Sequence, residues 1–143
     1  MVDTRDRLAA LLDKAELVEL VDRYVHHLDF DRDNDAWLDT VFTEDAELIF
    51  PQGTFRGMDE LREFQRVAYA KFPRSHHIGA NHRVVFEDDT AAVTVHLIAV
   101  HIGAAAGPAG HTSFGGFGTA TAIRTTMGWR IRRFAFTVAW SGQ

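Results

Sequence analysis

The chain has 143 residues, a length typical of one domain, and 46% of them are hydrophobic, which is enough to fill a core. It contains no cysteine, which excludes disulfides, thiolate chemistry and cysteine-ligated metal sites. A formal net charge of −5, without a Lys/Arg cluster interleaved with aromatics, argues against nucleic acid as a partner.

The first predicted element is a helix over residues 4–31. One apolar stripe identifies it, formed by Leu17, Leu20, Val21, Tyr24 and Leu28. Asp13 is a candidate cap that would break this helix in two. The segment lacks the basic start and apolar run of a signal peptide, and no stretch approaches the roughly 20 apolar residues that span a bilayer. We therefore expect one cytoplasmic domain over residues 1–143 with no membrane partner.

Two further helices and a strand follow. Asn34 or Asp35 could cap a short helix over residues 36–42, and residues 47–50 have the composition of a strand. The pattern of residues 57–72 predicts a second long helix, which ends before Pro73. Its apolar side is predicted to hold Leu61, Phe64, Val67 and Ala68.

The remainder of the chain is predicted to be strands, over residues 75–87, 91–102, 111–126 and 129–140. The small residues 103–110 are predicted to form the longest loop. Helices followed by a long antiparallel meander indicate an α+β fold. We expect a cone, in which a curved antiparallel sheet wraps around the N-terminal helices and leaves an open mouth.

Three stretches of the chain resemble a known family. They are YVHHLD (residues 24–29) with the following 42–46, then residues 55–57, and SHHIGAN (residues 75–81) with 128–130 near the end. Their order and spacing resemble the SnoaL-like branch of the nuclear transport factor 2-like superfamily. Within that branch the chain resembles scytalone dehydratase and bile-acid 7α-dehydratase. The resemblance implies cofactor-free elimination of water from a β-hydroxy carbonyl compound.

The same resemblance implies site residues. His77 matches the catalytic histidine that opens the strand after the second long helix, and His101 is placed like a second histidine of scytalone dehydratase. Tyr24 and Asp29 resemble the tyrosine–aspartate pair of the bile-acid enzyme. A histidine suits this chemistry because it can act as base and then as acid near neutral pH. A carboxylate would stabilise the imidazolium, and a phenol could donate to the developing enolate oxygen.

The residues themselves leave three choices open. Asp31 is as good a partner as Asp29 by helix phase. Strand alternation favours His76 as the inward histidine, unless a bulge near Gly79 resets the phase, whereas the resemblance favours His77. His96 and His101 are five residues apart, so simple alternation places them on opposite faces; we favour His101.

The predicted pocket binds a small hydrophobic substrate. Asn81 shares the parity of His77 and could hold substrate or water. The aromatic candidates for its wall are Trp37, Phe50, Phe117 and Phe136. No His-x-His or His-Glu-x-x-His spacing occurs, and no glycine-rich phosphate loop follows a strand, so we expect neither a metal nor an organic cofactor.

Two functions therefore follow from the sequence. The first is a cofactor-independent dehydratase or isomerase acting on a polycyclic, polyketide-like or steroid-like ketone. The alternative is a non-catalytic ligand-binding protein or a small subunit of an oxygenase-type complex, because fold alone does not determine function. In either case we expect a homo-oligomer, a dimer or trimer, with Trp129, Trp140 and the final strand at the interface.

Overall fold

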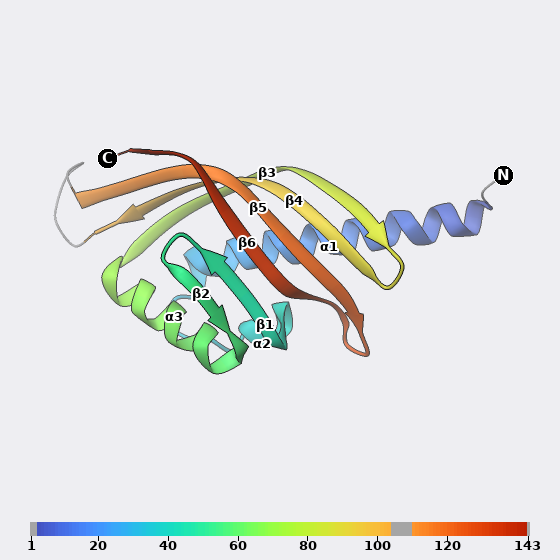
Figure 1. Ribbon diagram of the computed structural model, residues 1–143, viewed down its shortest axis with the longest axis horizontal. Helices are drawn as coiled ribbons and strands as arrows, with labels where there is room; N and C mark the ends of the chain where they lie inside the picture. The colour runs from blue at the N-terminus through green and yellow to red at the C-terminus, as the bar shows by residue number, and fades with distance from the viewer. Residues whose placement is uncertain (1–2, 104–109, 143) are drawn as a thin grey trace.

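The structure is a computed structural model that describes residues 3–103 and 110–142, so most of the loop expected at 103–110 lies outside the described residues. Three helices and six strands make up this part of the chain (Figure 1). In chain order they are α1 (Thr4–Phe30), α2 (Leu38–Val41), β1 (Phe42–Phe50), β2 (Gly53–Arg56), α3 (Gly57–Lys71), β3 (Arg74–Glu87), β4 (Thr90–Ile102), β5 (His111–Thr125) and β6 (Gly128–Gly142). The α+β class is confirmed.

One open, curved sheet contains all six strands, in the order β2-β1-β6-β5-β4-β3. The strands from β3 to β6 form the expected antiparallel meander, but β1 runs parallel to β6. The sheet is therefore mixed, because β6 pairs antiparallel with β5 on one side and parallel with β1 on the other. The strand expected at 47–50 begins already at Phe42, and β2, which the sequence did not predict, completes a hairpin with it.

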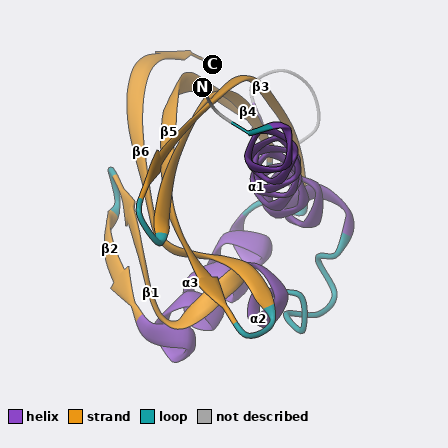
Figure 2. Ribbon diagram, turned by 90° about the vertical axis from the view of Figure 1, so that its right-hand side faces the viewer, coloured by secondary structure: helices purple, strands orange, loops and turns teal. Residues whose placement is uncertain are grey.

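Helix α1 lies on the concave side of the sheet, while α2 and α3 cover the end near β1 and β2 (Figure 2). The predicted apolar stripe of α1 is confirmed: Leu17, Leu20 and Val21 are almost fully buried in the core. The helix does not break at Asp13. That carboxylate instead accepts hydrogen bonds from Arg124 (2.7 Å) and from the indole N–H of Trp129 (3.1 Å), which tie α1 to the end of the sheet.

A β-bulge in β3 decides which of its side chains face the helices. The register with β4 shifts between Ala80 and Arg83, and Asn81 adopts a left-handed backbone (φ 57°), a conformation that asparagine tolerates better than most residues. Odd-numbered positions such as His77 face inward before the bulge, and even-numbered ones such as Val84 pack on the core after it. The bulge lies two residues beyond the Gly79 position considered from sequence.

Gly118 allows β5 to lie close to an aromatic ring of β6. A Cβ at this position would lie 2.7 Å from Cζ of Phe134, which is closer than van der Waals contact. Phe134 is nearly fully buried and meets Tyr24 edge-on, with ring centroids 5.2 Å apart. The absence of a side chain at Gly118 therefore helps to set the position of a ring that lines the interior.

Among the described helices, none combines the length and apolar character needed to cross a membrane.

Candidate active site

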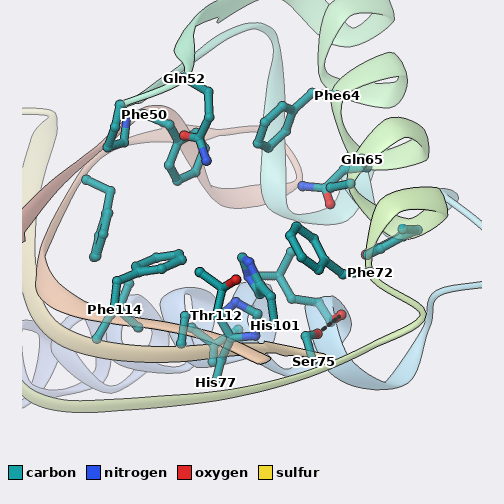
Figure 3. A pocket seen from close by; sticks show the side chains of 18 of the residues that line it. Phe50, Gln52, Phe64, Gln65, Phe72, Ser75, His77, His101, Thr112 and Phe114 are labelled. Carbon is teal, nitrogen blue, oxygen red and sulfur yellow. Dashed lines mark hydrogen bonds between the residues drawn. The ribbon is translucent and has the colours of Figure 1, made fainter. Parts of the chain in front are cut away.

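A cavity of about 400 Å³ lies between α1, α3 and the concave face of the sheet (Figure 3). This volume falls within the range of small-molecule sites. Most of its wall is aromatic or aliphatic. Part of its rim is formed by four exposed residues, Pro51, Gln52, Thr112 and Ser141. The apolar wall suits a hydrophobic ligand, and the few polar side chains can orient it.

Asp29 and His77 form a hydrogen-bonded pair in this wall. Oδ1 of Asp29 lies 2.7 Å from Nδ1 of His77, and Oδ2 accepts the backbone N–H of His77 at 2.8 Å. Both side chains are only 11% exposed. Because Asp29 engages Nδ1, Nε2 is the ring nitrogen available to a ligand in the cavity. The last turn of α1 and the start of β3 thus build an imidazole–carboxylate dyad.

The Asp29 carboxylate is held in its charged form. Burial alone would raise the pKa of Asp29, but hydrogen bonds from the His77 ring, from the Ser75 hydroxyl (2.7 Å) and from the His77 backbone outweigh it and lower the pKa. Ser75 is in turn bound by the Arg32 guanidinium at 2.8 Å. Arg32 also donates to the carbonyl oxygens of Leu28 and Phe72, so it fastens the end of α1 to the start of β3.

His101 faces the same cavity from β4. Its ring centroid lies 5.4 Å from that of His77, between the rings of Phe72 and Phe114. Burial, followed by the charges of His77 and Arg32, lowers the pKa of His101 to about 4. His101 is therefore neutral near pH 7, where it can donate or accept a hydrogen bond without carrying charge.

Tyr24 lines the cavity but does not hydrogen-bond with the dyad in the described structure. Burial raises the pKa of Tyr24 far above its ordinary value, so its hydroxyl stays protonated. Its polar neighbour is Gln65 of α3, which lowers this pKa to a smaller extent. The expected cluster of three is thus divided: imidazole and carboxylate meet, whereas the phenol lies beside the amide of Gln65.

Three predicted pocket residues lie elsewhere, and these expectations are corrected. Trp37 is 5% exposed and stacks on His27, outside the cavity wall. Phe117 points to the convex face of the sheet, where it meets His96 edge-on, because simple alternation along β5 turns it outward. Asn81 occupies the bulge and is exposed. Phe50 and Phe136 do line the cavity, as expected.

The structure also settles the open choices of orientation. Asp31 bonds to His27 rather than to His77, with 2.5 Å between Oδ2 and Nδ1. His76 is exposed, and His96 lies on the outer face, opposite to His101. The interface expectation for Trp129 is wrong, because its ring is 4% exposed. Trp140 is 47% exposed.

The prediction that Val67 lies on the apolar side of the second long helix is also wrong, because its side chain is 49% exposed.

Several polar residues of the wall were not predicted from sequence, among them Arg32, Gln65, Tyr69 and Ser75. A signal existed for two of them. Ser75 shares strand parity with His77, and Gln65 interrupts the apolar series from Leu61 to Ala68 at helical spacing. Arg32 follows the end of α1, where sequence periodicity does not predict which way a side chain points.

Within the described residues, no three His, Asp or Glu side chains are grouped in a way that could hold a metal ion.

Comparison with known proteins gives a consistent result. The SnoaL-like domain family matches residues 9–135. Among solved structures, the Kfla4162 protein from Kribbella flavida is 24% identical, with coverage of 94% of this chain and 95% of that one and a TM-score of 0.85. No curated protein matches the chain.

Two further structural neighbours have names that refer to enzymes. A protein from Novosphingobium aromaticivorans, provisionally described as a scytalone dehydratase, is 19% identical, covers 93% of this chain and 88% of its own, and has a TM-score of 0.81. A type 2 hexachlorocyclohexane dehydrochlorinase (LinA) is 17% identical, covers 98% and 92%, and has a TM-score of 0.80. At these identities the likeness shows the fold.

Proposed function

Since the chain belongs to the SnoaL-like domain family, we propose that it is a cofactor-independent lyase or isomerase that acts on a hydrophobic ketone through His77 and Asp29. The observation that carries this proposal is the buried dyad, whose free ring nitrogen is available to an apolar cavity. Structural neighbours named as a dehydratase and a dehydrochlorinase support elimination as the class of reaction. We further propose a cytoplasmic protein that needs no metal or organic cofactor.

In the proposed dehydration, Nε2 of His77 removes a proton from the carbon next to the substrate carbonyl. The electron pair of that C–H bond forms the new C=C bond as the β C–O bond breaks. The leaving hydroxide takes the proton back from the imidazolium, so that water is released and His77 is neutral again. Asp29 stabilises the imidazolium between these steps, because its charge lies against Nδ1.

One neutral group completes this scheme. His101 lies beside His77 and can hydrogen-bond the carbonyl or leaving oxygen without competing for the proton, because its pKa is lowered to about 4, first by burial and then by His77 and Arg32. The apolar wall strengthens each of these polar contacts. General acid–base catalysis of this kind contributes roughly 10²- to 10⁴-fold in rate.

The test is a matched pair of histidine substitutions. The probe is the aldol adduct of acetophenone and benzaldehyde, whose dehydration gives chalcone and is followed by absorbance. We expect the wild type and His76→Gln, which alters the exposed neighbour, to accelerate dehydration equally. His77→Gln should lose roughly 10²- to 10⁴-fold. Equal rates for both variants would remove His77 from the mechanism.

The second candidate, a non-catalytic ligand-binding protein or oxygenase subunit, draws support from the convex face of the sheet. Ile78, Ile98 and Phe117 are each more than 40% exposed there. A neighbour from Novosphingobium aromaticivorans, provisionally named an aromatic ring hydroxylase, is 27% identical with a TM-score of 0.83. The dyad in an unfilled cavity favours the enzyme. Ligand binding without turnover of any β-hydroxy ketone would favour this second candidate.

A further inference from the structure

Gln65 stands out in the interior because its polar side chain is buried without a complete set of partners. It is 2% exposed, and among the buried residues of the described structure it is the only one whose side chain is neither aliphatic nor aromatic. Its amide nitrogen Nε2 has no hydrogen-bond partner there. A buried donor left in this state is costly, and native interiors rarely tolerate one without a reason.

The unpartnered nitrogen is directed at the cavity. Figure 3 shows the side chain of Gln65 extending from α3 into the space that the aromatic rings enclose, with the amide nitrogen leading. Phe50 and Phe64, stacked with ring centroids 5.2 Å apart, lie on the same side of the cavity. Rings cannot accept the amide proton as strongly as an oxygen can, so a bound molecule would supply the missing acceptor.

Gln65 and the dyad occupy different walls. Helix α3 packs on β1 and β2, whereas His77 lies in β3, at the opposite edge of the sheet. Tyr24 of α1, whose hydroxyl stays protonated and lies beside the Gln65 amide, also lines the cavity there. The remaining wall is largely apolar, so the cavity offers two separate polar positions to one hydrophobic ligand.

We propose that the Gln65 amide binds a carbonyl or hydroxyl oxygen of the ligand, as a recognition site distinct from the dyad. The ligand class that fits is a ring compound with an apolar body and an acceptor oxygen remote from the reacting carbon. That the other end of this molecule carries the reacting ketone rests on the proposed function; binding of the remote oxygen to Gln65 does not.

The experiment measures affinity with probes that cannot react. Fluorenone has a ketone but no C–H bond next to it, so it cannot undergo the proposed elimination, and fluorene is its matched hydrocarbon. Dissociation constants of both are measured by calorimetry for the wild type, Gln65→Met and His77→Gln. Met has nearly the volume of Gln without its hydrogen-bonding groups, which keeps the packing of α3.

We expect the wild type to bind fluorenone more tightly than fluorene by roughly 2- to 10-fold, as one net hydrogen bond would provide. This ratio should fall to about one in Gln65→Met and persist in His77→Gln. An unchanged ratio in Gln65→Met, a ratio lost only in His77→Gln, or a wild type that does not prefer fluorenone would each overturn the proposal. Loss of chalcone formation in His77→Gln tests the proposed function separately.

A second measurement does not depend on the variant folding. The stretching band of a ¹³C-labelled fluorenone carbonyl moves to lower wavenumber when a donor binds its oxygen. We expect this shift on binding to the wild type, and an equal shift on binding to His77→Gln, because the proposed donor is Gln65. A bound carbonyl whose band stays at the position found in hydrocarbon solvent shows that no donor reaches it and contradicts the assignment.

Discussion

Asp29 binds His77 twice, through the ring at Nδ1 and through the backbone N–H, with one carboxylate oxygen for each contact. The double contact fixes both the tautomer of the imidazole and its orientation toward the cavity. An asparagine replaces one of these two oxygens by an NH2 group, which is a donor and would face one of the two N–H groups.

Asp29→Asn is therefore expected to slow chalcone formation by roughly 10²-fold or more, because the imidazolium loses its counter-charge. The exchange-protected Nδ1–H proton of His77 should also disappear from the downfield NMR spectrum. Asp31→Asn is the matched control, since Asp31 bonds to His27 only and lies two residues away. A rate for Asp29→Asn that equals the control would show that the dyad has no catalytic role.

The pKa of Asp29 predicts a pH dependence of stability. This pKa is lowered below 3.8 in the folded state, because hydrogen bonds from His77 and Ser75 outweigh the effect of burial. The folded state therefore holds fewer protons than the unfolded state as pH falls below 3.8, and the stabilisation present above that pH is lost through the folded pKa. Urea unfolding should show the gap between wild type and Asp29→Asn shrinking below about pH 4. A gap that widens there would contradict the direction of the shift.

His101 predicts a second dependence at higher pH. Burial and then the His77 charge lower the pKa of His101 to about 4 from 6.5, so between these values the unfolded state binds the extra proton. The stability present above pH 6.5 is lost as pH falls toward 4. After discounting for the partial exposure of the ring, we expect a loss of roughly 1 to 2 kcal/mol.

His101→Phe should remove this loss, because Phe72 and Phe114 already surround the ring with aromatic contacts. His96→Phe, at an exposed position of the same strand, is the control and should keep the wild-type slope. The measurement is the free energy of unfolding in urea at pH 7, 5.5 and 4.5. Parallel slopes for wild type and His101→Phe would show that His101 is not held neutral.

Gly118→Ala is expected to destabilise the protein and reshape the cavity. The added methyl would lie 2.7 Å from Cζ of Phe134, so the ring must move, at a cost of roughly 1 to 3 kcal/mol. Gly79→Ala is the comparison, because its methyl would meet Leu97 no closer than 3.4 Å. Thermal unfolding ranks the two, and fluorenone affinity should fall more for Gly118→Ala. Equal melting temperatures would mean that the Phe134 ring can move away from the added methyl at no cost in stability.

We propose that the convex face of the sheet pairs with a second copy of the chain. Register places Ile78 beside Ile98, and His96 beside Phe117. These four positions carry no Asp, Glu, Lys or Arg, so two copies of a protein with net charge −5 can approach there without direct like-charge contacts. Exposed apolar patches of this kind commonly mark interfaces.

Ile98→Glu should therefore shift the mass measured by light scattering toward the monomer. Leu11→Glu is the control, because Leu11 is 65% exposed on α1, away from this face. A wild type that is monomeric at tens of micromolar, or one that dissociates with Leu11→Glu and not with Ile98→Glu, would remove this interface.

The sequence by itself determined the fold class and most element positions. The apolar stripe of α1 and the alternation in β4 and β6 each bury one face, and that requirement alone predicts a helix packed on a sheet. The parity of β4 also separated His101 from His96. Such periodicities follow from local geometry, so no knowledge of distant contacts was needed.

Only the tertiary structure decided the site. Alternation along β3 favoured His76, and the bulge at Asn81 reversed that answer, because one extra residue moves every preceding side chain to the other face relative to those that follow. The choice of Asp29 over Asp31, and the place of Gln65 opposite His77, depend on how α1 and α3 meet a curved sheet. These are contacts between segments more than 40 residues apart or on different walls, which a local pattern does not encode.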